Sequence, residues 1–117
     1  SNRSGDTYIA YLFATLDGVS KVGSYTGTGS SQDIDCGFSA GARFILIKNT
    51  SDNADWLLYD STRGIVSGND PYLAINDTAA EVTTTDYIDP LNAGFTVNGS
   101  NVLVNASGDT YLFLAIS

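Results

Sequence analysis

Two aspartates, Asp33 and Asp35, alternate along one short stretch of the chain and are the first candidates for catalytic groups. Two carboxyl groups on one strand face could act as the acid and base of a glycoside hydrolase, provided that one had a raised pKa in a cleft. The same pattern fits two solvated side chains at a sheet edge, and nothing in the sequence predicts a cleft around them. We therefore expect no catalytic residue.

Histidine is absent from the chain, which excludes most other catalytic arrangements. Without an imidazole there is no Ser-His-Asp or Cys-His pair and no histidine metal ligand. The single cysteine, Cys36, has no basic residue close in sequence to lower its pKa, so we interpret it as a small buried side chain. The composition predicts a protein that is not an enzyme and holds no cofactor.

A polar loop offers oxygen ligands of the kind that Ca²⁺ prefers, from Asp52, Asn53 and Asp55. Their spacing does not match an EF-hand loop, and the ligand set is incomplete. A polar hairpin loop is the simpler interpretation. We expect no bound metal, and these three residues are only weak candidates for one.

Arg63 follows Asp60 by three residues and precedes a glycine, which allows two interpretations. The arginine could fix a corner of the chain through a charge-assisted hydrogen bond to Asp60 or Asp55. Its guanidinium could instead bind a ligand. We expect the structural role and keep ligand binding as the alternative.

Aromatic side chains could stack on a sugar ring, as they do in lectins. Trp56 lies among apolar residues, so we expect it to pack at least partly in the core. Tyr25, Tyr72 and Tyr87 lie near turn-rich segments and are expected to be more exposed. Together with Arg63, these tyrosines are the candidate ligand-binding residues.

The charge of the chain argues against two classes of partner. Five basic and thirteen acidic residues give a net charge of −8. Such a surface repels the phosphates of nucleic acids and of anionic lipids, so neither is expected to bind. No apolar run approaches the roughly 18 residues needed to cross a membrane.

Short runs of strand-forming residues, separated by Gly, Asn and Asp, must position these side chains. The expected strands are 7–15, 21–27, 31–36, 43–48, 55–60, 72–75, 95–97, 102–104 and 110–116. Asp17-Gly18 and Asn98-Gly99 are hairpin signals, and 78–81 could form one helical turn. The pattern predicts one all-β domain over residues 1–117, an antiparallel, jelly-roll-like β-sandwich of about nine or ten strands.

The pentapeptide Ser-Gly-Asp-Thr-Tyr occurs twice, at 4–8 and at 107–111, each time before an apolar run. The first copy could be the last strand of a preceding, related domain, so that residues 1–15 would belong to another repeat. Alternatively, the two copies could be neighbouring strands of one sheet. We expect the second arrangement, because an apolar run such as 9–14 would be insoluble if it were left exposed.

A series of motifs runs in order along nearly the whole chain. The motifs lie at 8–14, 23–29, 37–38, 44–48, 56, 60, 63–64, 76–81, 94–97 and 111–115. The series resembles a domain family of bacteriophage virion proteins, found in tail fibres and related structural proteins. Two positions depart from that family: 39–42 lack its usual proline, and Asn49 replaces its second basic residue.

The resemblance implies a jelly-roll-like sandwich and a virion role, and it carries over no catalytic site. We therefore expect a non-enzymatic structural module of a phage tail fibre or other appendage, assembled in the host cytoplasm. It would serve assembly or host-surface attachment, and it could bind a host-surface glycan. The expected partners are other virion proteins or further copies of the chain, most simply in a trimer. The alternative is a carbohydrate-binding module of a secreted enzyme or adhesin.

Overall fold

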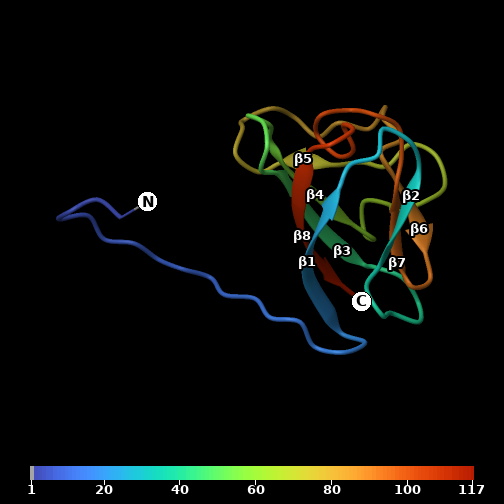
Figure 1. Ribbon diagram of the computed structural model, residues 1–117, viewed down its shortest axis with the longest axis horizontal. Coiled ribbons are helices and arrows are strands. Elements are labelled where there is room, and N and C mark those ends of the chain that lie inside the picture. The colour runs from blue at the N-terminus through green and yellow to red at the C-terminus, as the bar shows by residue number, and fades with distance from the viewer. Residues whose placement is uncertain (1) are drawn as a thin grey trace.

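The computed structural model describes residues 2–117, which form an antiparallel β-sandwich with an extended N-terminal segment (Figure 1). One sheet has five strands in the order β1-β8-β3-β4-β5, and the other has three in the order β2-β7-β6. The strands are β1 Ser20–Thr26, β2 Gln32–Asp35, β3 Phe44–Asn49, β4 Trp56–Asp60, β5 Leu73–Ala74, β6 Ile88–Leu91, β7 Gly94–Val97 and β8 Thr110–Ile116. Within residues 2–117 no helix is long and apolar enough to cross a membrane.

Strands that are distant in sequence lie side by side in both sheets. β8 pairs with β1 on one edge and with β3 on the other, and β2 pairs with β7. The chain therefore passes between the sheets repeatedly, as expected for a jelly-roll-like sandwich. The predicted fold class is confirmed.

The core lies between the two sheets and is built from alternate residues of each strand. In β3, Ile45 and Ile47 are fully buried, whereas Leu46 between them points to the outer side of the sheet. The opposite sheet contributes Phe95, whose ring packs edge-on against Phe113 at 5.5 Å between ring centroids. Each fully buried side chain of this size stabilises the fold by about 1.5–3 kcal/mol.

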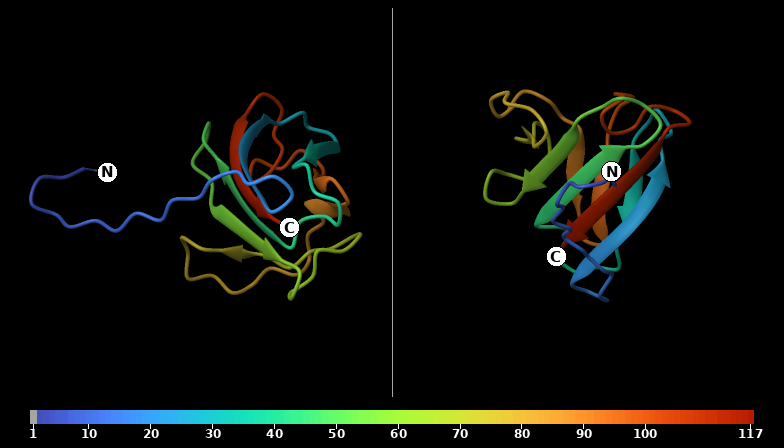
Figure 2. Two further views of the ribbon diagram at one scale, coloured as in Figure 1. Left: turned by 90° about the horizontal axis from the view of Figure 1, so that it is seen from below. Right: turned by 90° about the vertical axis from the view of Figure 1, so that its left-hand side faces the viewer.

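The predicted pairing of residues 7–15 with β8 is wrong. These residues belong to an extended N-terminal arm, residues 2–15, which runs away from the sandwich (Figures 1 and 2). Both edges of β8 are already occupied, so a further strand has no place beside it. Leu12 is 89% exposed and Ile9 is 82% exposed.

Two predictions for shorter segments are also wrong, and residues 2–117 form eight strands instead of nine or ten. Residues 102–104 form turns instead of a hairpin with β7, because β2 and β6 already pair with both edges of β7. Residues 78–81 do not form a helical turn. The turn at Asp17-Gly18 is confirmed, with Leu16 bridged to Ser20.

Deleting residues 1–14 is expected to change the thermal midpoint by less than about 4 °C, because the deletion removes little buried surface. Differential scanning calorimetry at low micromolar protein measures this midpoint. Deletion of 110–117 serves as the contrast, since it removes β8 and should abolish the transition. A drop of about 10 °C or more without the arm would show that the arm packs against a sandwich, within one chain or between copies.

Candidate functional site

The outer face of the five-stranded sheet carries an unusual surface. One row of residues is apolar in every strand and runs from edge to edge: Val22, Leu114, Leu46, Leu58 and Leu73. An antiparallel sheet with one face in water normally presents polar residues on that face. We call this row of five residues, together with Trp56 and Leu112, the apolar face.

Trp56 and Leu112 extend the apolar face beyond this row. Their side chains are 40% and 50% exposed. They line a hollow of about 310 Å³ together with residues of the row, and Tyr11 and Phe13 of the N-terminal arm border the same hollow. The expected packing of Trp56 in the core is wrong, because Trp56 lies on the outer side of β4 while Leu57 and Tyr59 face the core.

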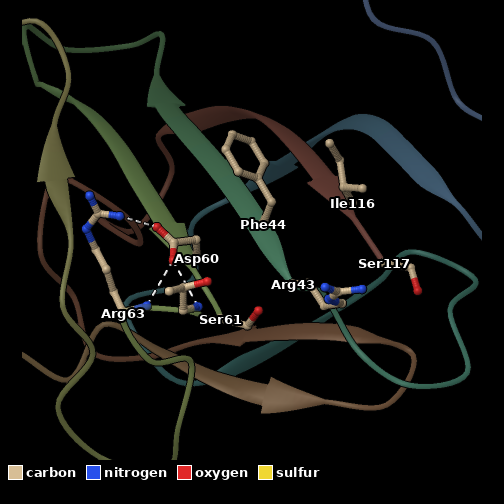
Figure 3. A pocket seen from close by; sticks show the side chains of 8 residues that line it. Arg43, Phe44, Asp60, Ser61, Arg63, Ile116 and Ser117 are labelled. Carbon is tan, nitrogen blue, oxygen red and sulfur yellow. Dashed lines mark hydrogen bonds and ion pairs between the residues drawn. The ribbon is translucent and has the colours of Figure 1, made fainter.

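A second, more polar pocket of about 620 Å³ lies around the start of β3 and the ends of β4 and β8 (Figure 3). Phe44 lies opposite Ile116 on β8 and opposite Asp60 on β4. Arginines and hydroxyl groups complete the lining, from Arg43, Ser61, Thr62, Arg63 and Ser117. An aromatic ring surrounded by charged and hydroxyl groups is the composition of a site for a small polar ligand.

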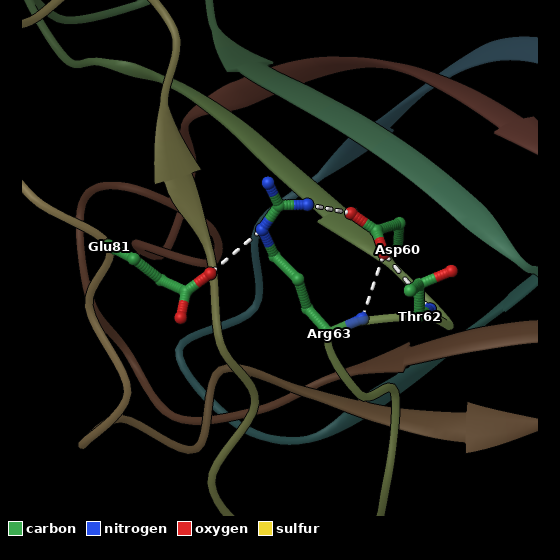
Figure 4. A network of polar contacts seen from close by, with 4 residues as sticks. All are labelled: Asp60, Thr62, Arg63 and Glu81. Carbon is green, nitrogen blue, oxygen red and sulfur yellow. Dashed lines mark hydrogen bonds and ion pairs between the residues drawn. The ribbon is translucent and has the colours of Figure 1, made fainter.

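Arg63 is held in this pocket by two carboxylates (Figure 4). Its Nη1 donates a hydrogen bond to Asp60 Oδ2, and its Nε donates to Glu81 Oε2 at 2.8 Å. The backbone N–H of Arg63 also donates to Asp60 Oδ1 at 2.9 Å and, with the guanidinium, holds the pKa of Asp60 below its usual value. The predicted Arg63–Asp60 corner is confirmed, whereas Glu81 is an acceptor that sequence spacing did not reveal.

Comparison with known proteins relates the whole chain to one family. Residues 1–117 match the domain of unknown function DUF7483. The chain belongs to this family. No curated protein and no solved structure matches it. Because the match includes the N-terminal arm as well as the sandwich, the arm is part of the DUF7483 sequence pattern.

The DUF7483 domain packs the candidate tyrosines against its core. Tyr25 stacks on Tyr111 with ring centroids 5.0 Å apart, and its hydroxyl donates to a backbone carbonyl at 2.7 Å. Tyr72 is buried between Tyr59 and Tyr87, at 5.7 and 6.0 Å. The expected exposure is wrong for Tyr72, which is buried, whereas Tyr25 and Tyr87 are half-buried and pack against the core.

Asp33 and Asp35 point outward from β2, as predicted, and line neither of the two hollows. Asp33 accepts a hydrogen bond from Thr96 Oγ1 at 2.7 Å, and Asp35 caps a turn by accepting from a backbone N–H. Cys36 is buried, which raises its pKa to about 11. The thiol is therefore protonated at neutral pH, and its interpretation as a small buried side chain is confirmed.

The hairpin loop between β3 and β4 contains the three weak metal candidates, Asp52, Asn53 and Asp55. Asp55 is turned toward Asn76, whose amide donates to its carboxylate at 3.0 Å. Asn49 fixes the loop by accepting from two backbone N–H groups at 2.8 and 3.0 Å. Among residues 2–117 no group of three acidic, histidine or cysteine side chains is arranged to hold a metal.

Asn105 is a fully buried residue that sequence reasoning missed, because an asparagine in a turn-rich segment normally indicates an exposed turn. Its Oδ1 accepts hydrogen bonds from Thr28 N and Gln32 Nε2, at 3.0 and 2.8 Å. Its Nδ2 donates to Ser30 O and Gly99 O, at 2.8 and 2.9 Å. One amide therefore ties together three segments at one end of the sandwich.

Asp70 is the one fully buried carboxylate among the described residues. Its Oδ1 accepts the Val66 N–H at 2.7 Å, but within residues 2–117 its Oδ2 has no hydrogen-bond partner. Desolvation raises the pKa of Asp70 to about 6, and the nearby charges of Asp89 and Asp86 act in the same direction.

We expect the free energy of unfolding to fall by roughly 1–3 kcal/mol between pH 4 and pH 7 because of Asp70. Its pKa is higher in the folded than in the unfolded chain, so the folded state binds the proton more tightly. The stabilisation is complete at low pH and is lost as the pH rises through the pKa that Asp70 has in the folded chain, about 6. Urea denaturation at several pH values measures the loss.

Asp70→Asn removes the titrating group and is expected to abolish this pH dependence, while the exposed Asp77→Asn is a control that should keep it. If wild type and Asp70→Asn differed by a constant amount at every pH, the assignment to Asp70 would be wrong.

Proposed function

We propose that this domain is a non-enzymatic structural module of a bacteriophage virion appendage, such as a tail fibre. It assembles with further copies of itself or with other virion proteins through the apolar face. The observation that carries this proposal is the apolar row that crosses all five strands of the sheet. An extended apolar surface of this kind is typical of a protein–protein contact.

The remaining surface supports assembly rather than chemistry. The chain has a net charge of −8 but no histidine, and its single thiol is buried. The acidic surface keeps the domain soluble, whereas the apolar face gains roughly 25 cal/mol for each Å² that a partner covers. The sequence resemblance to phage virion domains supports the appendage as the place of this assembly.

A symmetric homo-oligomer, most simply a trimer for a fibre, is the expected product of this contact. Light scattering after size exclusion measures the mass of the assembly. Val22→Asp puts a charge on the apolar face and should shift the domain to monomers. Val66→Asp is the matched control, because Val66 is similarly exposed but lies in a loop. Equal masses for both variants would exclude the apolar face as the contact.

The virion role is tested separately by immunogold labelling of purified phage particles with an antibody against the domain. We expect the label on the tail or another appendage. Recovery of the protein in the secreted fraction of a bacterial culture, with unlabelled particles, would contradict the proposal.

The polar pocket favours one alternative, a carbohydrate-binding module. The pocket combines Phe44 with Arg43, which makes no ion pair among residues 2–117. Isothermal titration against host-envelope glycans tests this alternative, with Phe44→Ala expected to remove binding. Binding that survived Phe44→Ala would exclude this pocket as the glycan site.

A further inference from the structure

The N-terminal arm repeats the beginning of β8 in backbone conformation as well as in sequence. The pentapeptide at 4–8 is identical to that at 107–111. Gly5 and Gly108 have positive φ angles of 87° and 89°. In both turns the aspartate N–H donates to the carbonyl three residues earlier, at 3.3 Å in the arm and 3.2 Å before β8. The arm therefore has the turn and the apolar run of a central strand.

The chemistry of the arm matches the apolar face. Residues 7–16 are uncharged, and their large side chains are exposed. An extended segment that is apolar on both sides, as this one is, normally becomes buried between two layers. The row from Val22 to Leu73 on the apolar face is uncharged as well.

The arm covers only part of the apolar face of its own sheet, where Tyr11 and Phe13 line the hollow. It is anchored next to β1, where Thr15 Oγ1 accepts from Val22 N at 3.1 Å and Ser20 Oγ donates to Ala14 O at 2.8 Å. From this anchor it projects outward, and in the right-hand view of Figure 2 it stands in front of the five-stranded sheet. The rest of the hollow, which measures about 310 Å³, remains open.

We propose that the arm of one copy fills the hollow on the apolar face of a second copy. This inference rests on the proposed role of the apolar face in assembly and names the segment that occupies it. An arm-to-face contact joins two different surfaces. In a dimer, each copy would bind the arm of the other; in a closed ring, the arm of each copy would bind the face of the next. A ring of three copies is the arrangement that fits the expected trimer.

Disulfide trapping between two differently tagged chains tests the contact. One chain carries Leu12→Cys in the arm, and the other carries Leu112→Cys on the apolar face. The native Cys36 is buried and does not compete. Mixed under mild oxidation, the two chains should form a disulfide-linked pair containing one of each. Asp77→Cys replaces Leu112→Cys in the control and should give less than about one tenth of that product, since residue 77 lies outside both sheets.

Two results would overturn the inference. In a chain with both Leu12→Cys and Leu112→Cys, a disulfide formed only within the chain would mean that the arm folds onto its own sheet. A link from Leu12→Cys to Ser24→Cys, which lies opposite Leu112 on β1, but not to Leu112→Cys would place the arm over β1 and not in the hollow. Either result leaves the virion role intact, because that role is tested on phage particles.

Discussion

Replacing Asn105 with aspartate is expected to lower the free energy of unfolding by about 4 kcal/mol or more at pH 7. The Nδ2 of Asn105 donates to Ser30 O and Gly99 O in a fully buried site. An aspartate would lose both donors, leave two carbonyls without partners and place a negative charge against them. Few single substitutions have so large an effect, and burial of an uncompensated charge is one of the known causes.

Guanidinium denaturation of wild type and Asn105→Asp measures the loss. The difference in free energy of unfolding between the two proteins should become smaller as the pH falls toward 4. The buried aspartic acid has a raised pKa, and its neutral form can donate one hydrogen bond. Asn101→Asp is the matched control, since exposed Asn101 uses only its Oδ1, as an acceptor from the Leu103 N–H. Equal losses for the two variants would contradict the role of Asn105 as a buried connector.

The second large effect is expected for Gly94→Ala, with a loss of about 3 kcal/mol or more. Gly94 is buried in β7 between β2 and β6. A Cβ at this position would lie 2.1 Å from the backbone oxygen of Ile34 and 2.9 Å from Cys36 Sγ. Since the closest atom belongs to the backbone of the neighbouring strand, the sheet itself would have to open.

Gly23→Ala provides the comparison, because Gly23 is also a strand glycine without a positive φ angle. There the nearest atoms are the tip of the Phe113 ring at 2.9 Å, which can rotate or shift. We expect a loss of about 1 kcal/mol, measured by the same denaturation. Similar losses of free energy of unfolding at both glycines would mean that the backbone of the three-stranded sheet can shift as easily as the Phe113 side chain.

Local patterns were sufficient for most strands but not for the place of the arm. The continuous apolar run at 44–47, flanked by Arg43 and Lys48, was sufficient to predict β3, which pairs on both edges and buries one face completely. The run at 9–14 has the same apolar character, yet its neighbours depend on which segments already occupy the edges of β8. That competition involves strands from the whole chain and cannot be deduced from one segment.

In the candidate site, too, local contacts could be predicted from the sequence, whereas contacts that depend on the whole fold could not. The Arg63–Asp60 contact joins residues three apart, so sequence spacing predicted it. The apolar face depends on the register between five strands, so Val22 and Leu73 become part of one row only after folding. Similarly, Tyr25 and Tyr72 lie beside turns, but packing between the sheets decides that their rings face inward.

The central place of β8 also determines when the domain can fold during translation. β1 and β3 are made early, but the strand that lies between them is the last of the eight to leave the ribosome. Until then, β1 has no partner in the sheet and β3 is paired only with β4, and pairing over such long sequence separations is slow. A prematurely terminated domain therefore cannot close its larger sheet, and only domains translated through β8 can enter an assembly.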